Sequence, residues 1–216
     1  MIKNRVTQLI VQTIYCTLGL VAIFASLGVF EAKFYNEFFI YFTNISNYIC
    51  IVIMFLELCQ TIKYANKNED GYCSFCPVLK FTGLIIIILT FLVFNVLLAK
   101  DMTLQQNLSI TSILFHIILP ILYVLDWFLF YEPNKTKWYY PFISLIVPIL
   151  YFIFILIRAS LIKIDQATLY PYFFLNIDKL GIGGILKWNI IICIAISFIG
   201  YSLVFINHLG KRKKSN

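Results

Sequence analysis

Charged residues are scarce in this chain: they form 12% of its 216 residues, whereas an ordinary soluble domain carries about a quarter. Hydrophobic residues reach 61%, and the mean hydropathy is +0.88. This composition excludes an ordinary soluble domain and indicates a membrane protein with several spans. The net charge of +7 does not indicate nucleic-acid binding, because the basic residues lie between the apolar runs. The expected surroundings are the lipid bilayer.

Motifs for cofactors and metals are also missing from the sequence. It contains no Walker, Rossmann or zinc-protease motif. The six cysteines lie mostly within apolar runs, so they give no disulfide framework. Cys73 and Cys76 have the spacing of a redox or zinc half-site, but no second pair and no nearby histidine accompany them. We expect neither a metal nor a cofactor.

Six apolar runs are each long enough to cross a bilayer, which takes about 20 residues. The first run is longer than the apolar region of a signal peptide, which has about 7–15 residues. No small-residue cleavage site follows it. The prediction is an all-α integral membrane bundle that forms one domain over residues 1–216. Its spans are expected at 8–30, 38–62, 78–99, 107–131, 138–161 and 186–208.

The basic residues are unequally divided between the two sides of the membrane. An even number of spans places both termini on one side, and lysine and arginine favour the cytoplasmic side. We therefore expect both termini in the cytoplasm. The inner segments would hold eleven basic residues, Lys3, Arg5, Lys63, Lys67, Lys80, Lys135, Lys137 and 211–214, and the outer ones six, Lys33, Lys100, Arg158, Lys163, Lys179 and Lys187.

The second run, 38–62, carries polar side chains that a lipid-facing helix would avoid. They recur at helical spacing, so they predict one inward-facing stripe. Its members are Thr43, Asn47, Cys50, Met54 and Glu57.

The fourth run places a histidine near the middle of the membrane. His116 is either a functional group or a neutral packing residue that bonds another helix. Pro120 has no N–H, so it should kink the helix and free the His116 carbonyl for another donor. Ser109 and Ser112 share the face of His116 and extend a polar path toward the outer side. The other histidine, His208, is most simply interfacial.

Two acids lie near the inner ends of their spans. Asp126 is too far along the helix to orient His116, so we expect it to pair with Lys135, Lys137 or a neighbouring helix terminus. Glu57 is expected to cap the inner end of its own span. Neither acid is assigned to the chemistry.

The segment 163–187 joins the last two spans and is rich in aromatic residues. It is either a cap that dips toward the bilayer or an interfacial aromatic anchor. Arg158, just before it, either binds a carboxylate or phosphate group or snorkels to the interface. Asn95, in the third span, is expected to bond a neighbouring helix or to donate to an oxyanion.

Thr43 and His116 are expected at similar depth, in the outer half to the middle of the membrane. A hydroxyl beside an imidazole is the minimal nucleophile and base for acyl transfer or hydrolysis. A threonine in a membrane helix, however, often only bonds its own helix.

Several motifs, in matching order over nearly the whole chain, resemble the androgen-induced-gene family of six-span membrane proteins, most closely its prokaryotic branch. They are 42–47 (FTNISN), His116 to Pro120, 125–127 (LDW), 170–173 (YPYF) and Leu180-Gly181. Phe173 and Asn176 depart from the pattern of the prokaryotic relatives. The resemblance implies a prokaryotic cell-membrane protein.

The resemblance also implies an intramembrane threonine hydrolase that cleaves fatty acid esters of hydroxy fatty acids, with Thr43 as nucleophile and His116 as base. The partner would be a membrane lipid or lipid ester. Alternatives are an acyltransferase with the same pair, a small transporter or channel, and a non-catalytic scaffold. The residues expected to contact substrate are Asn47, Asn95, Arg158, Tyr170 and Tyr172.

Overall fold

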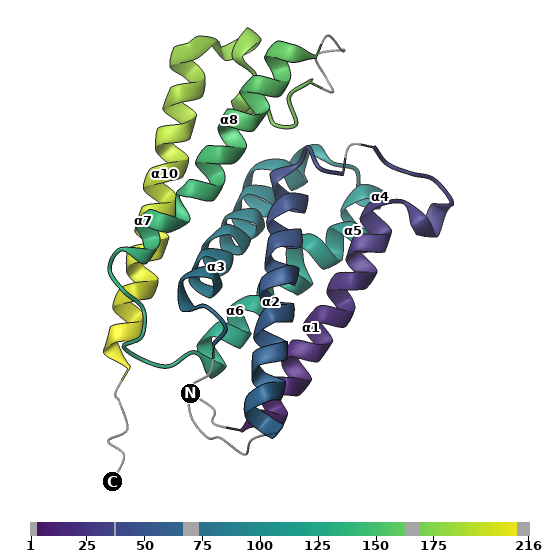
Figure 1. Cartoon of the computed structure of the whole chain (residues 1–216). Helices are drawn as coiled ribbons and strands as arrows, with labels where there is room; N and C mark the ends of the chain where they lie inside the picture. The colour runs from purple at the N-terminus through teal and green to yellow at the C-terminus, as the bar shows by residue number, and fades with distance from the viewer. Residues whose placement is uncertain (1–3, 37, 67–73, 163–168, 211–216) are drawn as a thin grey trace.

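A computed structural model describes residues 4–36, 38–66, 74–162 and 169–210 of the chain. The described residues contain six helices that are long and apolar enough to span a membrane (Figure 1). The predicted six-span, all-helical membrane bundle is thereby confirmed. These helices cover Arg5–Ser26, Phe42–Asn66, Pro77–Asp101, Ile110–Phe130, Tyr140–Leu161 and Ile177–Leu209.

The third, fourth and fifth spans are each built from more than one helical segment. The third consists of α3 (Pro77–Leu92), the π-helix η2 (Val93–Leu98) and the 3-10 helix η3 (Ala99–Asp101). The fourth consists of α5 (Ile110–Ile113), the π-helix η4 (Leu114–Ile118) and α6 (Leu119–Phe130). The fifth joins α7 (Tyr140–Ser144) to α8 (Ile146–Leu161).

The first helix, α1 (Arg5–Ser26), begins at the end of the bundle where the last helix, α10 (Ile177–Leu209), finishes (Figure 1). We call this the termini end, and the opposite end the cap end. The helix α2 (Phe42–Asn66) packs between α1 and α3, and α6 packs against α1 and α3. The helix α10 meets the bundle through α3, α7 and the segment before it.

Side-chain caps explain why two spans start earlier than predicted. Asn4 accepts hydrogen bonds from the backbone of Val6 and Thr7, so α1 starts at residue 5 and not at residue 8. Asn176 accepts from the backbone of Lys179, so α10 starts at residue 177 and not at 186. Gly181, with φ +64°, then breaks the first turn of α10 from the rest.

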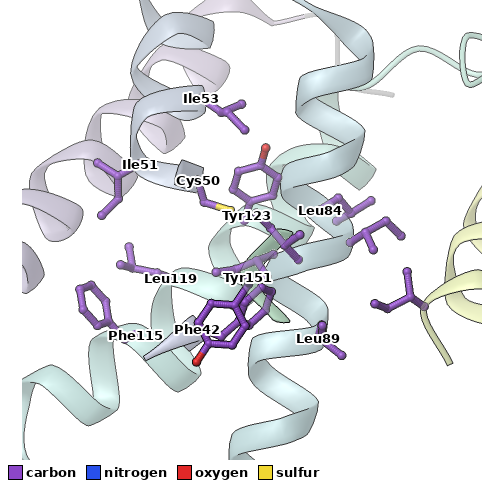
Figure 2. Close-up of a cluster of buried hydrophobic side chains, with 14 of the residues drawn as sticks. Phe42, Cys50, Ile51, Ile53, Leu84, Leu89, Phe115, Leu119, Tyr123 and Tyr151 are labelled. Atoms are coloured by element: carbon purple, nitrogen blue, oxygen red, sulfur yellow. The ribbon is translucent and has the colours of Figure 1, made fainter. Parts of the chain in front are cut away.

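The apolar core joins α2, α3, α6 and α8, as Figure 2 shows. Cys50 of α2, Leu84 of α3 and Tyr123 of α6 are fully buried there. Gly83 lets the Tyr123 ring lie against α3, because a Cβ at position 83 would run into the phenol. The Tyr123 hydroxyl donates to the carbonyl of Lys80 at 3.1 Å, which fixes α6 beside α3.

The segment 169–176 is buried in the protein at the cap end. Tyr170 and Tyr172 are 8% and 4% exposed, and Phe174 is also buried, whereas Phe173 points outward. This burial favours the cap over the interfacial aromatic anchor. Arg158 is itself buried, and its Nη1 donates to the Leu169 carbonyl at 2.7 Å, so the prediction of a snorkelling arginine is wrong.

Candidate functional site

A polar pocket of about 710 Å³ opens at the cap end of the bundle. Its walls come from the end of α1, the start of α2, and the segment that runs from η3 through α4 (Leu104–Asn107) and α5 to η4. Most of its lining side chains are polar and uncharged. The polar members are Ser26, Glu31, Tyr35, Tyr41, Asn44, Thr103, Gln105, Gln106, Ser109, Thr111, Ser112 and His116.

His116 contributes a ring without a hydrogen bond to this pocket. The side chain is 8% exposed, and its ring stacks on Phe94 with 3.6 Å between the centroids. Its Nδ1 is buried and has no partner. An imidazole that is held by stacking, with its nitrogens unoccupied by the described residues, can accept or donate a proton to a bound ligand.

Two asparagines replace the backbone bonds that Pro120 removes. Pro120 offers no N–H to the His116 carbonyl in an α-helix, or to the Phe115 carbonyl in a π-turn. Asn95 donates to the His116 carbonyl at 3.2 Å, and Asn47 donates to the Phe115 carbonyl at 3.0 Å. The prediction that the freed carbonyl finds another donor is confirmed. Both candidates thus position His116 from its backbone and do not line the pocket.

Thr43 lies near His116 but outside the pocket lining. It is the second residue of α2, which begins at Phe42 and not at residue 38 as predicted. Its N–H donates to the Tyr172 hydroxyl at 3.2 Å, and its side chain is hydrogen-bonded to the same phenol. Burial raises the pKa of Tyr172 to about 12, so the phenol stays protonated at neutral pH. No hydrogen bond joins Thr43 to His116 in the described residues.

Asn47 links the two predicted catalytic residues through the backbone. Its amide donates to the Thr43 carbonyl at 2.7 Å as well as to Phe115, the neighbour of His116. The side chain is fully buried. The backbones of Thr43 and Phe115 are therefore joined through one buried amide.

Ser112 is the hydroxyl that shares the pocket with His116. It precedes His116 by four residues and is 7% exposed, and its Oγ has no hydrogen-bond partner. Ser109 accepts from the Ser112 N–H at 3.2 Å and so caps α5. The predicted polar face of Ser109, Ser112 and His116 lines one pocket, as expected. Ser46, by contrast, bonds Thr90 and the Thr43 carbonyl in the bundle interior.

The other residues that were predicted to contact substrate, Arg158, Tyr170 and Tyr172, lie at the cap and do not line the pocket. Arg158 holds Leu169, and Tyr170 is hydrogen-bonded to Asp178 at the start of α10. Sequence reasoning missed Glu31, Asn44 and Gln106 as pocket residues. They come from span ends and connections, where polar residues are ordinary and carry no distinguishing signal.

A buried ionic cluster occupies the other half of the bundle, toward the termini end. The Lys80 Nζ lies 2.7 Å from Asp126 and 3.3 Å from Glu57, and all three side chains are at most 1% exposed. Gln12 of α1 donates to Asp126 at 3.2 Å. Glu57 also accepts from the Phe75 N–H at 3.0 Å, just ahead of α3.

This cluster corrects three expectations. Asp126 pairs with Lys80 and not with Lys135 or Lys137, because α6 packs against the first turn of α3. Glu57 binds the segment before the next helix and does not cap its own helix end. Lys80 and Arg158 are buried inside the bundle, so removing them from the predicted division leaves ten basic residues on the inner side and five on the outer side.

His208 and the cysteine pair stand apart from the pocket. The His208 Nδ1 lies 2.8 Å from the Val204 carbonyl, and its ring stacks on Trp138 at the termini end. Cys73 lies outside the described residues, and Cys76 precedes α3. The described residues contain no group of three metal-binding side chains.

A second hollow, of about 780 Å³, runs along α10. Its lining comes from α10 alone and is mostly apolar, with Ile190, Ile194 and Phe198 among its members. Lipid tails cover a face of this kind in a membrane protein. The histidine pocket is therefore the candidate site, although it is slightly the smaller of the two.

Comparisons with family models, with curated proteins and with solved structures give no match for this chain. The fold defines its class: a multi-pass helical membrane protein with a polar pocket at one end. The resemblance to the androgen-induced-gene family remains a prediction from the sequence motifs.

Proposed function

We propose that this chain is an intramembrane hydrolase of lipid esters with His116 as its general base. One observation carries the proposal: a buried, stacked imidazole without a hydrogen-bond partner lines an open polar pocket beside the unbonded hydroxyl of Ser112. General bases act within hydrogen-bond reach of a hydroxyl or a water that enters with the substrate.

The reaction proceeds by ordinary acyl transfer. The hydroxyl oxygen attacks the ester carbonyl carbon while His116 accepts the hydroxyl proton. The carbon–oxygen bond to the alcohol then breaks, and the alcohol leaves with that proton. Water attacks the acyl-enzyme, again with His116 as base, and this step releases the fatty acid and restores the hydroxyl.

Two hydroxyls compete for the role of nucleophile. Thr43 is the residue that the family resemblance implies, and its hydroxyl is engaged by Tyr172. Ser112 lies in the pocket with His116 and has no partner. Attack by Thr43 requires its hydroxyl to break the hydrogen bond to Tyr172. Attack by Ser112 does not require a hydrogen bond to be broken.

The closely packed interior between His116 and the termini end favours an enzyme over a channel. Phe115, Leu119 and Tyr123 are fully buried and fill the bundle along the same helix. The Lys80 cluster binds α3 to α2 and α6 nearer the termini end. The polar pocket lining admits water, which supports hydrolysis over acyl transfer to a second lipid.

The orientation belongs to the same proposal. Without the buried Lys80 and Arg158, the sequence assigns ten basic residues to the termini side and five to the cap side, which favours a cytoplasmic termini end. The pocket would then open on the outer face of a prokaryotic cell membrane, and substrate would enter from the bilayer.

Labelling by a fluorophosphonate probe tests the nucleophile and the base together. The probe phosphonylates an activated hydroxyl, and activation requires a base because the free hydroxyl has a pKa far above neutrality. We expect labelling of the detergent-purified protein, strongly reduced in His116→Ala. Thermal unfolding of each variant controls for loss of the fold.

The labelled residue, identified by peptide mass spectrometry, decides between the hydroxyls. Loss of labelling in Thr43→Ala with retention in Ser112→Ala assigns the threonine, and Thr43→Ser should then keep some labelling. The reverse pattern assigns Ser112. Wild-type protein that is folded, unlabelled and inactive toward lipid esters would contradict the proposed function.

A further inference from the structure

The pocket that contains His116 is almost without charge. Glu31 is the only acidic residue among the described residues that line it, and it accepts a hydrogen bond from the Tyr35 hydroxyl. Within that lining no lysine or arginine is present. Lys33, after η1, and Lys100, in η3, lie at the same end, but both are exposed and neither is part of the lining.

The basic residue that could bind a fatty carboxylate is engaged elsewhere. Arg158 lies within the bundle and donates to the carbonyl of Leu169, which belongs to the cap. Neither residue lines the pocket. An anionic group in the pocket would therefore meet Glu31 without a cationic partner. Like charges at close range disfavour binding, and the effect increases as water is excluded.

The uncharged lining suits a ligand rich in hydroxyl groups. Serine hydroxyls both donate and accept hydrogen bonds, and glutamine amides offer separate donors and an acceptor. Gln105, Gln106, Ser109 and Ser112 present such groups around His116. Two of the groups, the Ser112 Oγ and the His116 Nδ1, are buried and without a partner, so they remain available to a ligand.

We propose, building on the hydrolase function above, that the substrate is a lipid ester with an uncharged, hydroxyl-bearing head group, such as a monoacylglycerol. Esters that carry a free carboxylate or a phosphate bind the same pocket poorly. This narrows the substrate class away from esters of hydroxy fatty acids with a free acid group.

A matched set of esters with one acyl chain tests this substrate class. The set contains a monoacylglycerol, a fatty acid ester of a hydroxy fatty acid, and the methyl ester of that same compound, which removes only the charge. We expect kcat/KM for the methyl ester and the monoacylglycerol to exceed that for the free acid by about tenfold or more, a difference of about 1.4 kcal/mol.

Glu31→Gln should narrow the ratio between methyl ester and free acid, because it removes the repelling charge. Glu132 follows α6 at the termini end and pairs with Lys135, so Glu132→Gln is the matched control and should leave the ratio unchanged. A free acid that is hydrolysed as fast as its methyl ester would overturn the substrate class while leaving the hydrolase function intact.

Ligand binding distinguishes failure of the hydrolase function from failure of the proposed head-group preference. If none of the esters is hydrolysed, the hydrolase function fails, and thermal stabilisation by the same compounds then decides the head-group preference. Stabilisation by the monoacylglycerol and not by the free acid supports an uncharged ligand. Equal or greater stabilisation by the free acid overturns it.

Discussion

A single proline shapes the surroundings of His116. Pro120 withholds an N–H from the preceding turn, and the chain adopts the π-helix Leu114–Ile118 directly before α6. Asn47 and Asn95 donate to the two carbonyls involved. The backbone of His116 is therefore fixed by side chains of α2 and η2, and its ring by Phe94.

At this scale we predict that Asn47→Ala destabilises the fold. The change leaves the Phe115 carbonyl without its donor in a buried place, which costs about 1–2 kcal/mol for a hydrogen bond between membrane helices. Unfolding in mixed detergents measures the loss. Asn189→Ala is the control, because Asn189 bonds only its own helix. Equal stability of the two variants would contradict the role of Asn47.

The residues Thr43, His116 and Pro120 could be identified from the sequence, but not all of their contacts could. The missing N–H of Pro120 is a local property, so the need for another donor could be predicted without a structure. The stacking of Phe94 on His116 and the contact of Tyr172 with Thr43 could not, because each joins residues that are distant in the chain. No periodicity encodes such pairs.

At the scale of helices, the Lys80 cluster joins four segments near the termini end. The lysine sits in the first turn of α3, opposite Glu57 of α2 and Asp126 of α6, and Gln12 adds α1. The sequence showed three ionisable residues near span ends, where charge is ordinary. Only the packing of α6 against α3 turns them into a buried cluster.

Lys80→Met should therefore destabilise the bundle strongly. It leaves two buried carboxylates without their cation, and breaking a buried ion pair costs about 3–5 kcal/mol. The loss is measured by unfolding in mixed detergents. Lys187→Met, at an exposed position of α10, should change stability little. Wild-type stability of Lys80→Met would show that the cluster does not hold the helices together.

At the scale of the whole molecule, the chain is asymmetric along the membrane normal. The cap end holds a polar pocket and a buried aromatic segment, and the termini end holds the ionic cluster. The six-helix architecture followed from span length and composition. Span starts did not, because caps such as Asn176 extend a helix beyond its apolar run.

The orientation can be measured with single cysteines in a cysteine-free background. Lys33→Cys reports on the cap end and Lys135→Cys on the termini end, and both positions are exposed. A maleimide that cannot cross membranes should label residue 33 in intact cells and residue 135 only after permeabilisation. The opposite labelling pattern would reverse the orientation.

We propose that His116 performs chemistry on a lipid ester, and turnover in reconstituted vesicles measures this role. The measurement is fatty acid release from a monoacylglycerol by wild-type protein, His116→Gln and His208→Gln. His208 is the matched control, because it is the only other histidine and lies at the termini end.

We predict turnover by the wild type and by His208→Gln, and a loss of about 10²-fold or more in His116→Gln, the usual contribution of a general base. Comparable thermal unfolding of the three proteins must accompany this result. Undiminished fatty acid release by folded His116→Gln would contradict the role of His116 as general base.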